Sequence, residues 1–180
     1  MEPIISSIQQ IGIGNPYVHE AWKWYRQKLG MDVKIFEEAA EANLMLKYTG
    51  GMPHKRHAIL ALNMNGGGGM EIWQYTSRKP VSAGFNIQYG DLGIYICKIK
   101  SRDIDASFQY MQKQGVELLG SISKHPSGDT HFFLKDLYGN IFEVVEANDW
   151  FGKTNFTTGG VYGAVIGVSN LEKALSFYRD

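Results

Sequence analysis

Two carboxylates in apolar surroundings are the first candidates for chemistry in this chain. Glu71 stands in the run Met-Glu-Ile-Trp, and Glu143 stands in the run Phe-Glu-Val-Val. A carboxylate that faces a protein interior must find hydrogen-bond donors or a cation, or its pKa rises, because burial disfavours the charged form. An inward orientation would therefore favour a ligand role for both side chains. An outward orientation would make them ordinary surface carboxylates.

The histidines offer few further donors. His131 lies on a predicted strand and is the best candidate to add a nitrogen ligand beside the carboxylates. His57 lies near the start of another predicted strand, with His54 just before it, and histidines at strand edges are usually at the surface. We expect His19 to face solvent from a predicted helix and His125 to lie in a loop.

The single cysteine, Cys97, has no partner for an internal disulfide. Its place in the middle of a predicted strand favours a buried thiol that packs as a small apolar residue, a usage typical of a reducing compartment. We therefore predict a cytoplasmic protein.

The glycine run at 66–69 is predicted to be a flexible hairpin loop. A phosphate-binding loop would need the GK[ST] signature and a following helix, but here Met70 continues as a strand.

A strand-to-helix pattern that positions these residues occurs three times. In each copy an aromatic residue on a helix follows a fixed strand position by about fifteen residues. The pattern runs from Gln10 to Tyr25, from Gly93 to Phe108, and from Gly163 to Tyr178. Paired repeats build clefts between them, so the repeat also indicates where a site should lie.

Each complete repeat is predicted to be a β-α-β-β-β unit. The first unit has its helix at 17–29, with Gly30 as the C-cap, and the second has its helix at 103–114. The segment 37–46 suits a helical insertion as well as a loop, and the sequence leaves this open. The predicted strands lie at 5–14, 32–37, 56–63, 69–75, 91–99, 116–122, 130–135, 141–147 and 161–168.

The units divide the chain into five parts, with a third unit that is incomplete. The first unit covers 1–77, a linker 78–90, the second unit 91–148, a second linker 149–160, and the start of the third unit 161–180. A lone strand and helix cannot bury a sheet face, and an unpaired strand at 161–168 favours association. We therefore expect a longer chain with further units, or pairing with another copy as a homodimer.

Composition excludes several classes of partner. The 180 residues are 44% hydrophobic and 20% charged, as in an ordinary globular protein. The 18 basic and 18 acidic side chains cancel, and no basic block appears, so we expect no nucleic-acid partner. No apolar run approaches the roughly 20 residues that a membrane span needs, so we expect no membrane partner either.

Several segments resemble the vicinal oxygen chelate superfamily, which contains glyoxalase I, the bleomycin and fosfomycin resistance proteins and the extradiol dioxygenases. They are Gln10–Ile13, the helix Ala21–Met31, Met70–Trp73, Phe132–Val145 and Asn170–Asp180. The resemblance implies an α+β fold in which paired β-α-β-β-β units form curved mixed sheets around a shared cleft, followed here by a truncated third unit. It specifies no single reaction, because the family shares an architecture more than a substrate.

The resemblance also implies a metal site, because each unit of such a pair contributes a ligand from its first and its last strand. In this sequence those positions are Gln10 and Glu71, then Gly93 and Glu143. Gly93 has no side chain, so the implied ligands of a divalent metal ion are Gln10, Glu71 and Glu143. Zinc, nickel, iron, manganese and magnesium cannot be distinguished with this donor set. Gly163 takes the same position in the third unit.

The leading functional hypothesis is therefore a metal-dependent lyase, isomerase or dioxygenase that binds a small substrate through two vicinal oxygens. Glu71 or Glu143 would act as the catalytic base. One alternative is a metal-free protein that binds or sequesters a small molecule, as the bleomycin resistance proteins do. Another is the non-catalytic half of a longer enzyme.

Aromatic side chains are predicted to line the substrate pocket. Trp73 and Tyr75 share the strand face of Glu71, and Tyr95 lies on the first strand of the second unit. If that face is the cleft, these three rings and His131 form an aromatic pocket. The alternative is ordinary core packing.

Overall fold

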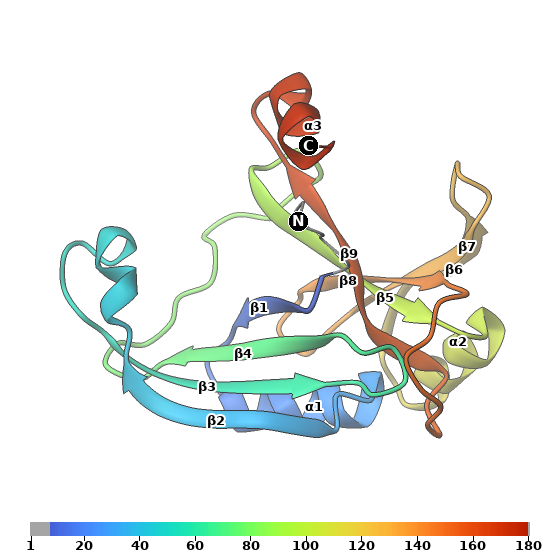
Figure 1. Ribbon diagram of the computed structural model, residues 1–180, viewed down its shortest axis with the longest axis horizontal. Helices are drawn as coiled ribbons and strands as arrows, with labels where there is room; N and C mark the ends of the chain where they lie inside the picture. The colour runs from blue at the N-terminus through green and yellow to red at the C-terminus, as the bar shows by residue number, and fades with distance from the viewer. Residues whose placement is uncertain (1–7, 180) are drawn as a thin grey trace, which may run out of the picture.

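The computed structural model describes residues 8–179, which form two mixed β-sheets. The first sheet has the strand order β1-β4-β3-β2, with β1 parallel to β4 and the other pairs antiparallel. Helix α1 packs against it (Figure 1). The elements are β1 (Gln10–Gly14), α1 (Val18–Leu29), β2 (Val33–Glu41), β3 (Lys55–Leu62) and β4 (Gly69–Tyr75).

The second sheet repeats this order and adds one strand, giving β6-β7-β8-β5-β9. Strand β5 is parallel to β8, as β1 is to β4, and helix α2 packs on this sheet. The elements are β5 (Gly93–Ser101), α2 (Ile104–Lys113), β6 (Glu117–Lys124), β7 (Thr130–Lys135), β8 (Ile141–Glu146) and β9 (Thr158–Gly167). The predicted α+β fold of β-α-β-β-β units is confirmed.

The prediction of an unpaired strand at 161–168 is wrong. Strand β9 begins at Thr158 and pairs antiparallel with β5 along most of its length. In the second sheet β5 pairs with β8 on one side, and β9 pairs with the other side of β5. Helix α3 (Leu171–Arg179) follows it and projects away from both sheets (Figure 1), with Phe177 and Tyr178 exposed.

The segment that the sequence left open, 37–46, contains a strand and a short helix. Strand β2 continues to Glu41 because β3 already begins at Lys55 and provides a partner there. A 3-10 helix, η1 (Asn43–Tyr48), follows. At the other end of the first unit, β1 accounts for the later part of the strand predicted at 5–14, and residues 5–7 lie outside the described part of the chain.

Each sheet has a helix-covered face that forms the core and an opposite face that carries the candidate site residues. In β4, Met70 and Ile72 are buried in the core, so Glu71 lies on the other face. In β8, Phe142 and Val144 are buried in the same way, and Glu143 lies on the other face. No helix in residues 8–179 has the length and apolar character of a membrane span.

Contacts between segments far apart in sequence join the two units. The hydroxyl of Tyr25 on α1 donates to the carboxylate of Asp136, which follows β7, and both side chains are buried. The β3–β4 loop also packs against the start of β9. A Cβ atom at Gly66 would lie 2.3 Å from the backbone nitrogen of Gly160, so only glycine permits this approach. The glycine run predicted to be flexible is instead a close-packing contact.

Candidate functional site

The first unit places two of the predicted metal ligands side by side. Gln10 on β1 and Glu71 on β4 belong to neighbouring parallel strands, and the Gln10 amide donates to one carboxylate oxygen of Glu71 at 2.8 Å. Both side chains are partly buried. The residue directly opposite Glu71 is Gly12, where an added Cβ would meet no atom within 4 Å. Glu71 therefore faces open space.

The second unit places Glu143 in a closed ionic cluster. One carboxylate oxygen lies 2.7 Å from Nδ1 of His131, and the other lies 3.0 Å from the ammonium of Lys98. The second ring nitrogen of His131 is also engaged, at 3.0 Å from the hydroxyl of Ser123. Glu143 is 2% exposed. The protein itself therefore supplies the partners that a buried carboxylate requires.

The strand register revises one position of the repeat. Gln10 pairs with the residue two before Glu71, and in the second unit Ile96 pairs with the residue two before Glu143. The structural counterpart of Gln10 is thus Ile96, three residues after the predicted Gly93. Neither Ile96 nor Gly93 has a side chain that can bind a metal ion.

The cause of this offset is the helix. Tyr25 is the eighth residue of α1, and the eighth residue of α2 is Met111. Both are fully buried. Phe108 lies one helical turn earlier on the same face, so counting back from it places the unit three residues too early.

The predicted metal ligands fit an ion unequally. Gln10 and Glu71 are adjacent oxygen donors, and only one oxygen of Glu71 is used by their hydrogen bond. Glu143 fits poorly because the Lys98 ammonium already occupies the place of a cation beside it. Within residues 8–179, no cluster of three His, Cys, Asp or Glu donors contains Glu71 or Glu143. The metal-ligand role of Gln10, Glu71 and Glu143 stays a prediction.

The three aromatic residues predicted to line one substrate pocket lie on two different sheets, with Trp73 and Tyr75 on β4 and Tyr95 on β5. Trp73 and Tyr75 contact each other on the Glu71 face, and the guanidinium of Arg56 stacks over Trp73 at 5.1 Å. Tyr95 belongs to the second sheet, where β5 has an irregular register, and its ring packs edge-on against Tyr89. The structure thus brings Trp73 and Tyr75 together near Glu71, whereas Tyr95 packs elsewhere.

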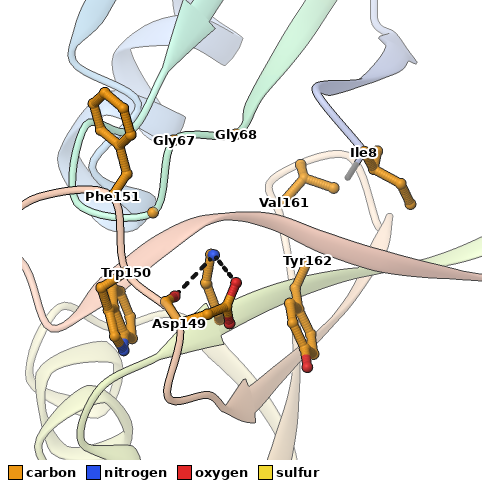
Figure 2. A pocket seen from close by; sticks show the side chains of 10 residues that line it. Ile8, Gly67, Gly68, Asp149, Trp150, Phe151, Val161 and Tyr162 are labelled. Atoms are coloured by element: carbon orange, nitrogen blue, oxygen red, sulfur yellow. Dashed lines mark hydrogen bonds and ion pairs between the residues drawn. The ribbon is translucent and has the colours of Figure 1, made fainter. Parts of the chain in front are cut away.

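A cavity of about 480 Å³ lies where β9 meets the β3–β4 loop. Its volume falls in the range of small-molecule sites. Figure 2 shows Trp150 and Tyr162 on either side of the ion pair made by Asp149, with the loop glycines Gly67 and Gly68 across from them. The residues that line the cavity are Ile8, Gly66, Gly67, Gly68, Lys100, Asp149, Trp150, Phe151, Val161 and Tyr162.

Lys100 supplies the positive charge of this cavity. It is only 6% exposed, and its ammonium donates to the backbone oxygen and the carboxylate of Asp149, both at 3.1 Å. The rings of Trp150 and Tyr162 flank it, each centroid 5.8 Å from the ammonium. A lysine ammonium has three N–H donors, so one remains beyond the two bonds to Asp149.

A bulge in β9 brings Tyr162 to Lys100. Between Lys98 and Ile99 the register with β5 shifts, so that Gly163 and Val161 are the paired residues and Tyr162 is the extra one. Sequence analysis missed this cavity because Trp150 and Phe151 fall in a predicted linker and because the sequence does not show that β9 pairs with β5. Two signals were available: Lys98 and Lys100 alternate with apolar residues at the end of the strand predicted at 91–99, and Gly163 interrupts the strand predicted at 161–168, as a glycine at a bulge does.

The Cys97 thiol is buried, as predicted. Its burial raises the pKa of the thiol to about 12. The thiol therefore stays neutral at physiological pH and is a poor nucleophile.

Comparisons with known proteins agree on one superfamily. The family model described as "Glyoxalase/Bleomycin resistance protein/Dioxygenase superfamily" matches residues 7–144. A glyoxalase family protein from Bacillus cereus aligns with a TM-score of 0.63 at 14% identity, covering 84% of this chain and 98% of its own. A glyoxylase/bleomycin resistance protein/dioxygenase domain from Frankia sp. EAN1pec aligns with a TM-score of 0.57 at 10% identity, covering 81% and 100%. At these identities the likeness concerns the fold. No curated protein matches the chain.

Proposed function

Because this chain belongs to the glyoxalase/bleomycin resistance protein/dioxygenase superfamily, we propose that it binds a small molecule, without a metal ion, in the cavity between β9 and the β3–β4 loop. The observation that carries the proposal is the buried ammonium of Lys100, which lines this cavity between two aromatic rings. The cluster around Glu143 supports the metal-free form, because the Lys98 ammonium already neutralises that carboxylate and a ring nitrogen of His131 contacts its other oxygen.

The lining of the cavity favours a planar aromatic molecule with an acidic group. Trp150, Phe151 and Tyr162 provide flat apolar surfaces, and the remaining N–H donor of Lys100 would bind the anionic group. The side chain of Asp149 is 73% exposed, so it can swing into solvent and yield its place on Lys100 to the ligand.

Naphthoate and the neutral naphthylmethanol are matched probes for this site. Calorimetric titration of the full chain should show binding of both, with naphthoate tighter. Lys100→Met should weaken naphthoate about tenfold or more, the loss expected of a charge-assisted hydrogen bond, and should leave naphthylmethanol nearly unchanged. Asp149→Asn should strengthen naphthoate, because it removes the competing carboxylate from Lys100.

Lys135→Met is the matched control, because Lys135 forms its ion pair with Glu117 on the surface of the second sheet. It should leave both affinities unchanged. Equal naphthoate affinity in wild type and Lys100→Met would contradict the proposal. The higher naphthoate affinity expected for Asp149→Asn excludes misfolding as the cause of the changes in affinity, since a misfolded variant would not bind naphthoate more tightly.

The second candidate is the metal-dependent lyase, isomerase or dioxygenase, and the Gln10–Glu71 pair favours it. These two oxygen donors lie on the open face of the first sheet, and β1 is the edge strand of that sheet. Donors from another unit or another copy of the chain would have to complete the site. A bound ion would polarise two vicinal oxygens of a substrate.

Metal analysis of protein purified without chelator tests this second candidate. The candidate requires bound metal that is lost in Glu71→Gln and retained in Glu143→Gln, because Lys98 neutralises Glu143. Equal metal content in wild type and Glu71→Gln would rule out the Gln10–Glu71 pair as its binding site.

A further inference from the structure

A separate cluster of potential metal ligands lies on the helix-covered face of the first sheet. His19, Glu37 and His57 each offer one ligand atom, and these atoms all lie within 4.8 Å of one another. One Glu37 carboxylate oxygen lies 3.0 Å from Nε2 of His57 and 3.5 Å from Nε2 of His19. In the part of the chain that the structure describes, no other group of three such residues gathers in this way.

Three elements hold the cluster in place. His57 on β3 pairs with Ala39 of β2, which puts Glu37 diagonally opposite His57 on the same face. His19 is the second residue of α1, and its ring packs edge-on against that of His57 with centroids 5.1 Å apart. The side chains of His57 and Glu37 are 24% and 25% exposed, and that of His19 is 65% exposed. Two donors are therefore held firmly while the third can adjust.

The distances from the Glu37 oxygen to the two histidine nitrogens suit a tetrahedral ion. Ligand atoms at about 2.0–2.1 Å from zinc lie about 3.3 Å apart in a tetrahedron. The two distances from Glu37 to the histidines, 3.0 and 3.5 Å, bracket that value. Only a small movement of the exposed His19 would be needed to equalise them.

The charges around the cluster favour a cation at the shared oxygen of Glu37. The ammonium of Lys34 lies 2.6 Å from the other carboxylate oxygen, and its hydrogen bond holds the pKa of Glu37 below the usual value. Glu37 is therefore ionised at neutral pH. Among residues 8–179, Lys34 is also the one lysine or arginine that forms an ion pair with the cluster, so it weakens binding by repulsion but does not occupy the oxygen that faces the two imidazoles.

We propose that His19, Glu37 and His57 bind a divalent transition-metal ion, preferentially Zn²⁺. Two imidazoles and one carboxylate suit zinc, nickel or copper and not magnesium or calcium, which prefer oxygen ligands. Three protein ligands leave a fourth position for water.

This site is distinct from the Gln10–Glu71 pair. His57 shares its strand face with Ile59, which is buried under α1, whereas Leu60 pairs with Glu71 on the opposite face. The two sets of donors thus lie on opposite sides of one sheet.

Titration of the full chain with ZnCl₂, monitored by calorimetry, tests the proposal. Wild type should bind one Zn²⁺, and Glu37→Gln or His57→Gln should each weaken binding at least tenfold. Glu38→Gln is the matched control, because Glu38 is adjacent on β2 and pairs with Arg56 instead. Glu38→Gln and Glu71→Gln should bind as wild type does.

Lys34→Met provides a change in the opposite direction. Removing the neighbouring ammonium should strengthen Zn²⁺ binding several-fold, an outcome that a misfolded variant would not give. The proposal is overturned if wild type binds no Zn²⁺, if Glu37→Gln and His57→Gln bind as wild type does, or if binding is lost in Glu71→Gln.

Discussion

Glu71 and Glu143 occupy equivalent positions in the two units, yet their surroundings differ in almost every respect. Glu143 faces Lys98 across the strand pair and His131 on β7, whereas the register puts Gly12 and Ala58 at those two positions around Glu71. The carboxylate of Glu143 is buried and is neutralised by Lys98. The carboxylate of Glu71 accepts one hydrogen bond from Gln10, and the space over the neighbouring Gly12 is open.

A carboxylate at the same backbone position can therefore belong to a structural ion pair in one unit and be an available metal or ligand donor in the other. The choice depends on two neighbouring side chains and not on the carboxylate itself. Replacing glycine and alanine by lysine and histidine converts an open position into a closed one. Of these two equivalent carboxylates, Glu71 is the one with an oxygen available to a ligand from outside the fold.

The largest expected effect on the free energy of unfolding comes from removing the Lys98 ammonium beside Glu143. Lys98→Met would leave Glu143 almost fully buried and without the ammonium that lies 3.0 Å from its carboxylate. We expect a loss of about 3 kcal/mol in the free energy of unfolding, because an unpaired buried charge is costly. Urea unfolding measures it, and the double variant Lys98→Met, Glu143→Gln should recover much of the loss. A change below about 0.5 kcal/mol would mean that the Lys98–Glu143 ion pair does not stabilise the second unit.

A smaller effect is expected at the buried hydrogen bond between Tyr25 of the first unit and Asp136 of the second. Burial, together with the nearby Asp136 carboxylate, raises the pKa of the Tyr25 hydroxyl well above its usual value. Because the folded-state pKa is higher than that of the unfolded chain, this contribution is complete below about pH 10 and is lost as the pH rises above it.

Tyr25→Phe should cost about 1–2 kcal/mol at pH 7, since Asp136 loses one of its donors. The variant should also be less sensitive to pH than wild type between about pH 9 and 11. Unfolding by urea at several pH values measures both. Parallel pH curves for the two proteins would show that Tyr25 does not ionise on unfolding.

Gly12→Lys should give Glu71 the partner that Glu143 already has. A Cβ at Gly12 meets no atom within 4 Å, so the side chain fits. We expect a gain of about 0.5–1 kcal/mol, mostly from replacing glycine in a strand. Gly14→Lys is the control, because it has equal space on the same strand but lies opposite Trp73. A larger gain for Gly14→Lys would show that Glu71 does not accept a cation.

The smallest effect is expected for Gln10→Ala. Its hydrogen bond to Glu71 is only partly buried, so the free energy of unfolding should fall by no more than about 0.5–1 kcal/mol. Thermal unfolding measures this. A loss of several kcal/mol would mean that the pair is structural, like the cluster around Glu143.

The repeat predicted the fold well because strand alternation and helix periodicity follow directly from side-chain burial. The C-cap at Gly30 has the expected left-handed conformation, with φ of 71°. The candidate site could be predicted less well. The sequence singled out Glu71, Glu143 and His131 as candidates and left open which way the two carboxylates face, whereas Lys98, the partner that neutralises Glu143, is visible only through strand pairing.

Other features could not be predicted because they depend on tertiary placement. The second unit is offset by three residues from its predicted position because Phe108 and Met111 share one helix face, and Met111 takes the fully buried position that Tyr25 has in the first unit. The pairing of β9 with β5 joins residues that lie 57 to 74 positions apart, and the bulge that presents Tyr162 to Lys100 arises within that pairing.

The contact between the β3–β4 loop and the start of β9 limits how this sequence can change over evolution. A Cβ at Gly160 would lie 2.2 Å from the carbonyl oxygen of Gly68, and one at Gly66 would meet Gly160 almost as closely. A substitution at any of these glycines would wedge β9 away from the loop and change the cavity beside it. Lineages that keep the cavity should therefore keep these glycines, while its aromatic wall is free to diversify and to select different molecules.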